Sequence, residues 1–154
     1  MQENNEETKN KISVGLIISN EDFKNNPIFP REVIKEISDC PHYLLIFISR
    51  EDVIKISCFP TKTNNIKKVL IHLTEFSPEL VKGISSVLKD MNLSKHILHT
   101  TGLCYEMENC FYETYLVGDN LETNDITVEI IKEKFMNIAK VIDVIVEDIP
   151  IFNN

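Results

Sequence analysis

Residues Lys67–Asn92 read KKVLIHLTEFSPELVKGISSVLKDMN and change once from one hydrophobic periodicity to another. In Lys67–Glu75, the apolar residues Val69, Ile71 and Leu73 alternate along the chain and share one face of a predicted strand. The following apolar residues recur at steps of three and four, which predicts a helix with one apolar stripe. They are Leu80, Val81, Ile84, Val87, Leu88 and Met91.

Ser77-Pro78-Glu79 predicts where this helix begins. A serine hydroxyl caps free backbone amides, and proline suits the first helical position. The Glu79 carboxylate then lies in the first turn, near the positive end of the helix dipole. Asn92 is the expected stop.

The rest of the second half predicts a hairpin, a second helix and a last strand. The hairpin pairs Lys95–Glu106 with Cys110–Gly118, the helix runs from Asp125 or Thr127 to Lys140, and the strand covers Asp143–Ile149. The order over residues 66–150 is therefore βαββαβ. Because parallel crossovers are right-handed, this order predicts a ferredoxin-like fold, an antiparallel four-stranded sheet with both helices on one face.

Such a fold leaves the second face of the sheet bare, with Leu70 and His72 pointing to it. We expect this apolar surface to be hidden by the N-terminal segment or by a second copy of the chain.

The N-terminal third is predicted to be rich in strands. Residues 1–10 read as a disordered tail, Ile12–Ser19 as a strand, Phe23–Pro30 as a loop and Arg31–Ser38 as a short helix with Val33, Ile34 and Ile37 on one side. A hairpin follows, formed by Tyr43–Ser49 and Val53–Phe59. Residues 11–62 are either an extension that lengthens or covers the sheet, or a partial copy of the βαββαβ pattern. The loop Pro60–Asn65 marks the boundary.

Composition narrows the class of protein. Of the 154 residues, 43% are hydrophobic and 26% are charged, as in an ordinary globular protein. No apolar run is long enough to span a membrane, and the polar, acidic N-terminus is no secretory signal, so a cytoplasmic location is expected. The net charge of −8, without a basic cluster, makes nucleic acid an unsuitable partner.

The four cysteines, Cys40, Cys58, Cys104 and Cys110, form no C-x-x-C pair. In a chain expected to be cytoplasmic, we expect them to be reduced thiols that pack as small apolar residues.

No pattern of catalytic or metal-binding residues stands out. His96 and His99 are three apart on a predicted strand and face opposite sides, so they do not share a metal ion, although His72 could join one of them. Cys104 lies among acidic residues that would raise the pKa of its thiol. The four glycines are too far apart to form a phosphate loop. We expect no enzyme activity, no cofactor and no metal.

The second half resembles the ACT domain, a regulatory module of ferredoxin-like fold that binds amino acids and related ligands. The resemblance covers roughly residues 66–149 and is carried by Leu73-Thr74-Glu75-Phe76-Ser77-Pro78-Glu79-Leu80, where the first strand turns into the first helix. The family has a polar turn followed by Pro-Gly-x-Leu, and the chain has Glu79 at the glycine position. If the N-terminal third is a partial copy, the resemblance implies a partial second ACT-like unit, as tandem arrangements occur among amino-acid sensors; the extension remains the alternative.

The resemblance implies a ligand site at Glu75, Phe76, Ser77, Pro78 and Glu79. Because Glu79 would repel an anion at the helix start, the turn would receive a ligand's ammonium group through Glu75 or Glu79, or receive nothing. Thr100, Thr101 and Gly102 would line the same cleft if a partner's sheet lay alongside, since ligands of ACT-like dimers lie at such interfaces.

Three functions remain open at this stage. The first is a homodimeric sensor or regulator that binds a small molecule, such as an amino acid, and acts through a protein partner. The second is a ligand-free assembly module that docks a partner on its bare sheet. The third is a small enzyme that uses His72, His99 and acidic residues.

Overall fold

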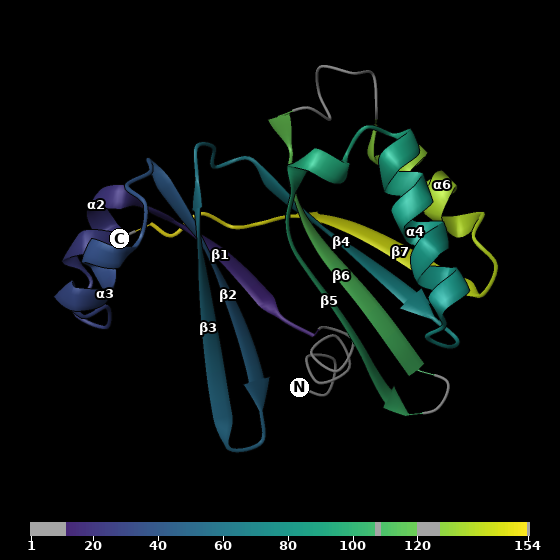
Figure 1. Ribbon diagram of the computed structural model, residues 1–154, viewed down its shortest axis with the longest axis horizontal. Helices are drawn as coiled ribbons and strands as arrows, with labels where there is room; N and C mark the ends of the chain where they lie inside the picture. The colour runs from purple at the N-terminus through teal and green to yellow at the C-terminus, as the bar shows by residue number, and fades with distance from the viewer. Residues whose placement is uncertain (1–11, 107–108, 120–126, 154) are drawn as a thin grey trace. The chain divides into compact units, whose positions relative to one another are not determined.

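The computed structural model describes residues 12–106, 109–119 and 127–153 and has a mixed α+β fold (Figure 1). The chain divides into two compact units. Unit 1 contains Ile12 and Asn65–Asp148, and unit 2 contains Ser13–Asn64 with the C-terminal residues from Ile149 onward. The predicted tail (residues 1–10) lies outside the described residues. So do residues 107–108, within the second predicted hairpin, and residues 120–126, which include the earlier of the two predicted helix starts, Asp125.

Unit 2 is a three-stranded antiparallel sheet in the order β1-β2-β3. Its strands are β1 (Val14–Ser19), β2 (His42–Arg50) and β3 (Val53–Thr61). The predicted hairpin is confirmed, because β2 and β3 pair from His42–Thr61 to Arg50–Val53. The C-terminal segment joins this unit, since the Ile17 N–H donates to the Pro150 carbonyl (2.9 Å) and the Phe152 N–H donates to the Ile17 carbonyl (2.7 Å).

The prediction of a loop over Phe23–Pro30 is wrong in part, because helix α2 (Asn20–Asn25) follows β1 and includes Phe23. The Ser19 hydroxyl caps this helix by accepting from the Asp22 N–H at 3.1 Å. Phe23 is buried and its ring stacks on Tyr43 with centroids 4.2 Å apart. One buried ring stabilises this short helix, and a six-residue segment is too short to reveal that through periodicity.

Helix α3 (Arg31–Glu36) agrees with the predicted short helix, but its apolar residues do not all face inward. Ile34 and Ile37 pack against the buried cluster around Phe23 and Tyr43, whereas the Val33 side chain is exposed. The prediction that Val33 shares the buried side is therefore wrong.

Unit 1 contains a four-stranded antiparallel sheet in the order β5-β6-β4-β7. The strands are β4 (Ile66–Leu73), β5 (Ile97–Glu106), β6 (Asn109–Val117) and β7 (Val141–Asp148). Helix α4 (Pro78–Asp90) follows β4, a short 3-10 turn (Ser94–His96) leads into β5, and α6 (Val128–Met136) follows β6.

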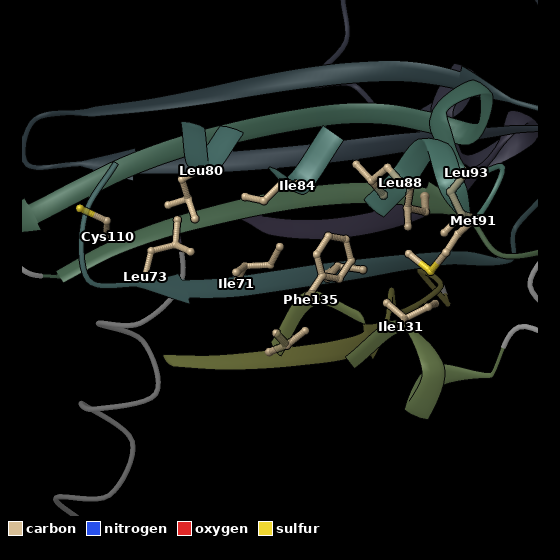
Figure 2. Packing of buried hydrophobic residues seen from close by; sticks show 13 residues of the cluster. Ile71, Leu73, Leu80, Ile84, Leu88, Met91, Leu93, Cys110, Ile131 and Phe135 are labelled. Atoms are coloured by element: carbon tan, nitrogen blue, oxygen red, sulfur yellow. The ribbon is translucent and has the colours of Figure 1, made fainter. Parts of the chain in front are cut away.

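Helices α4 and α6 cover the same face of the unit 1 sheet (Figure 1). Leu80, Ile84 and Leu88 of α4 and Ile131 and Phe135 of α6 belong to one buried cluster. Figure 2 shows these side chains meeting those of β4, including Ile71 and Leu73. The prediction from alternation and helical spacing that one sheet face receives both helices is confirmed by this cluster.

The predicted start of the first helix is confirmed. Ser77 precedes α4 in an extended conformation, and its hydroxyl accepts from the Leu80 N–H at 3.3 Å. Thr127 caps α6 in the same way through the Ile130 N–H, also at 3.3 Å. In each helix a hydroxyl satisfies one of the free amides of the first turn.

The second helix ends four residues earlier than predicted, at Met136 instead of Lys140. Lys140 adopts a positive φ of 73°, which ends any helical continuation. Ile138 still packs against the cluster, but Ile142, placed on the same apolar face by its spacing, is exposed.

The second face of this sheet is partly covered by the N-terminal end of the described chain. Ile12 is buried against Leu70 and Phe111. Its backbone N–H donates to a carboxylate oxygen of Glu113 at 2.8 Å. The N-terminal segment thus supplies part of the cover expected from the sequence, and the contribution of a second copy stays a prediction.

The prediction that all four cysteines are reduced thiols is wrong. Cys104 and Cys110 face each other on β5 and β6 and form a disulfide. Cys40 and Cys58 are free thiols. The reason for the error is geometric, because residues six apart in sequence lie directly opposite each other across the hairpin. This pairing has no signature in the sequence of the kind that a C-x-x-C spacing provides.

Among the described residues, no helix has the length and apolar character needed to cross a lipid bilayer.

The shared cluster predicts a sharp contrast between two adjacent residues of α6. Ile131 is fully buried, whereas Ile130 is 36% exposed. We expect Ile131→Ala to lower the free energy of unfolding by about 2–5 kcal/mol, because it leaves a cavity between helix and sheet. The matched variant Ile130→Ala should cost less than about 1 kcal/mol. Urea denaturation measures both, and equal losses would contradict the assigned helix face.

Candidate functional site

Two turns meet at one end of the unit 1 sheet. The first joins β4 to α4, and the second joins α6 to β7. The Thr74 N–H donates to the Lys140 carbonyl at 3.1 Å and holds the turns together. Lys140 reaches this position in the left-handed region, with φ 73°.

A small cavity of about 240 Å³ lies between these turns. From the first turn and the start of α4 come Glu75, Ser77, Glu79 and Leu80, and from the second turn come Ile138, Ala139 and Lys140. Three of the residues expected at a ligand site, Glu75, Ser77 and Glu79, therefore line one cavity. Pro78, also expected there, occupies the first position of α4.

The cavity carries both signs of charge. The Lys140 ammonium forms an ion pair with a carboxylate oxygen of Glu75. Their side chains are 52% and 44% exposed, so this pair contributes little stability and is open to competition. Glu79 adds a second carboxylate in the first turn of α4. The apolar side chains of Leu80 and Ile138 also line the cavity.

Phe76 turns away to cover the neighbouring edge strand. A Cβ atom added at Gly102 of β5 would lie 2.3 Å from Cζ of Phe76, so the ring rests directly on the glycine. The Phe76 and Tyr112 ring centroids are 6.4 Å apart. The Tyr112 hydroxyl hydrogen-bonds with the Thr100 side chain, and burial raises the pKa of Tyr112.

Thr101 lies on the other face of the sheet from Gly102. It pairs with Glu113 of β6, and its hydroxyl is 2.8 Å from Nε2 of His99. Successive residues of a strand point to opposite faces, so Thr100 and Gly102 lie on the helix side and Thr101 does not. The expected trio is thus divided, and only Gly102 contacts the β4–α4 turn, through Phe76.

Lys140, Ile138 and Ala139 are the cavity residues that sequence reasoning missed. The βαββαβ order itself could have predicted that these residues lie near the β4–α4 turn. Because β4 and β7 are antiparallel neighbours, the start of α4 and the turn that precedes β7 must lie at the same end of the sheet. The error in the end of the second helix hid this, since it placed Lys140 inside a helix.

His72 and His99 have different side-chain partners in the unit 1 sheet. Nε2 of His72 is 2.7 Å from the Asn109 side-chain oxygen, and its ring stacks on Phe111 with centroids 4.5 Å apart. His99 instead lies opposite Tyr115, four positions from Phe111 along β6. Within the described ranges, no group of three His, Cys, Asp or Glu side chains could hold a metal ion.

Comparison with known proteins gives no assignment: no family model matches the chain, and no curated protein sequence matches it.

The contact between Phe76 and Gly102 predicts strong coupling between these positions. Gly102→Ala should destabilise the protein by about 1 kcal/mol, because the added methyl group forces the Phe76 ring off the strand. In a Phe76→Ala background the same change should be neutral or stabilising, since alanine restricts the unfolded chain. A double-mutant cycle by denaturation measures the coupling, and additive effects would contradict the contact.

His99 should titrate below the ordinary value. Burial lowers the pKa of its imidazole below 6.5, and attraction to Glu113 opposes that shift. The unfolded chain then binds the proton more readily, so stability falls as pH is lowered through about 6.5. An NMR titration gives the pKa directly, and His99→Gln should reduce the loss of stability between about pH 7.5 and pH 5.5. A midpoint at or above 6.5 would refute this assignment.

Proposed function

We propose that unit 1 is a ferredoxin-like, ACT-like regulatory domain that binds a small molecule in the cavity between the β4–α4 and α6–β7 turns. Two observations support the fold assignment: the strand order β5-β6-β4-β7, which a split pair of βαβ units produces, and the single cluster shared by α4 and α6. The cavity supports the function, because it lies at the turn on which the ACT resemblance rests.

The proposed ligand is a small zwitterion of the size of an amino acid. The cavity, at about 240 Å³, is smaller than the roughly 300–1,000 Å³ typical of pockets for drug-sized molecules. Lys140 would bind the ligand's carboxylate in place of Glu75. Glu75, once released, and Glu79 would receive the ammonium group, and Leu80 and Ile138 would contact an apolar side chain.

This arrangement accounts for the glutamate at the usual glycine position. The Glu79 carboxylate interacts favourably with the positive end of the α4 dipole, which an anionic ligand would otherwise occupy. The ligand's carboxylate is therefore assigned to Lys140, a residue from the second turn. A ligand held by both turns would stabilise their contact.

Regulation would follow from differential binding. A ligand that favours one arrangement of a homodimer over another shifts the population of that arrangement, and a protein partner reads the result. The proposal includes no enzyme activity, no cofactor and a cytoplasmic location. Thr100 and Thr101 would contribute only where a second copy lies beside β5.

The alternative is a ligand-free assembly module, and it has its own support. Lys140 and Glu75 pair with each other, so each charge has a partner within the protein. On the sheet face opposite the helices, Ile145 is 45% exposed and Tyr105 is 42% exposed. Both could contact a protein partner on that face.

Thermal unfolding in the presence of single amino acids tests the proposal. A ligand at about 100 times its Kd adds about 2.7 kcal/mol to stability, which raises Tm by several degrees for a domain of this size. We expect Lys140→Ala and Glu79→Lys to abolish this rise.

Glu129→Lys is the matched control, because Glu129 occupies the same position in the first turn of α6. It should keep the full rise in Tm. If no amino acid raises Tm, the sensor proposal fails and the assembly module is favoured. Light scattering provides the separate test of the homodimer, whose mass should be twice 17.8 kDa.

A further inference from the structure

The disulfide between Cys104 and Cys110 joins an exposed residue to a buried one. Cys104 lies on β5, an edge strand of the unit 1 sheet, and is exposed. Cys110 lies on β6, is only 1% exposed and belongs to the buried cluster. An external thiol therefore reaches the bond from the Cys104 side, without unfolding of the cluster.

The bridge lies beside the β4–α4 turn. Cys110 pairs with Leu73, the last residue of β4, and Figure 2 shows Cys110, Leu73 and Leu80 at the same end of the cluster. Two residues before Cys104, and on the same face of β5, Gly102 carries the Phe76 ring. The disulfide thus links β5, on which the Phe76 ring rests, to β6, which pairs with Leu73 of β4.

We propose that Cys104–Cys110 is a reversible redox site for a dithiol reductant, and that its oxidation state controls the order of the β4–α4 turn. Where the turn binds a ligand, a consequence that rests on the proposed function, the oxidised form presents the better-ordered site. In the cytoplasm, disulfides are characteristically transient and redox-sensing, which agrees with this role.

The exchange proceeds in two balanced steps. A thiolate of the dithiol attacks the Cys104 sulfur, the Cys104–Cys110 bond breaks, and the Cys110 sulfur leaves and takes up a proton. The second thiol of the reductant, as thiolate, then attacks the mixed disulfide and releases the Cys104 thiolate, which is protonated. Two electrons and two protons reach the protein, and the reductant becomes a disulfide. A disulfide oxidant reverses the sequence.

The two remaining cysteines do not take part. Cys40 and Cys58 belong to unit 2 and are free thiols. Burial raises the pKa of the Cys58 thiol to about 11, so it remains protonated and unreactive near neutral pH. A change of two titratable thiols on reduction is therefore assigned to Cys104 and Cys110.

Reduction removes the covalent link, and the end of β5 is then held by backbone pairing with β6 and by the Tyr105 ring, whose centroid lies 6.0 Å from that of Phe111. The pair Glu106–Asn109 follows an irregularity in the β5–β6 register, so this end has few regular contacts. As β5 loosens at Gly102, Phe76 loses its support and the turn gains freedom. The amides of Thr74 and Leu80 report this directly, because they donate to the Lys140 carbonyl and the Ser77 hydroxyl.

The test is hydrogen exchange on the full chain, oxidised and then reduced with dithiothreitol, with thiols counted by alkylation and mass spectrometry. Reduction of the folded protein should add two thiols and speed exchange at Thr74 and Leu80 on the order of tenfold. The Ile130 amide, which donates to the Thr127 cap of the other helix, is the internal control and should not change.

Two variants complete the design. Cys104→Ala/Cys110→Ala should exchange rapidly at Thr74 and Leu80 under all conditions, and Cys40→Ala/Cys58→Ala should respond to reduction as the unaltered chain does. A bond that resists dithiothreitol until global unfolding would overturn the proposal, and so would reduction without faster exchange at the turn. The readout needs no ligand, so failure of amino acids to bind would refute the proposed function and leave this result intact.

Discussion

The packing of α4 and α6 against one face of the unit 1 sheet is the constraint on which the candidate site depends. Val69, Ile71 and Leu73 alternate along β4 and form the floor of the shared cluster. Because both helices pack on these residues, the turn after α6 lies beside the turn before α4. Lys140 and Glu75 therefore come close enough to form an ion pair. No short-range signal joins these two residues, which are 65 positions apart in the chain.

Strand alternation then decides which residues can reach the site. Gly102 and Cys104 share the helix-covered face of β5, and Thr101 points to the opposite face. The same parity places Cys110 in the core beside Leu73. A redox bond and a glycine-supported ring therefore lie next to each other because both occupy alternate positions of one hairpin.

The long periodic segments of unit 1 could be predicted from the sequence, as could the Ser77 cap, because each depends on residues close together in the chain. Helix α2 could not, since its stability comes from Phe23 stacking on Tyr43, a contact between distant residues. The end of α6 was missed because Ile142 kept the helical spacing after the backbone had turned at Lys140. The disulfide could be predicted only from the exact register of the β5–β6 hairpin. The pattern of apolar residues leaves that register uncertain by a residue or more.

The second sheet face of unit 1 bears on how a homodimer could form. Lys68 and Glu113 are buried on it as an ion pair, with 3.0 Å between Nζ and Oε1. Glu113 also accepts the Ile12 N–H, so Ile12 and Lys68 both donate to this carboxylate. Burying such a pair is costly, and removing one donor leaves a charge poorly compensated.

A second copy that displaced Ile12 would therefore lose a charge-assisted hydrogen bond as well as the contacts of Ile12 with Leu70 and Phe111. Contact through Ile145 and Tyr105, which stay exposed on this face, carries no such cost. In the proposed homodimer, a partner that binds around Ile12 is thus favoured over one that replaces it.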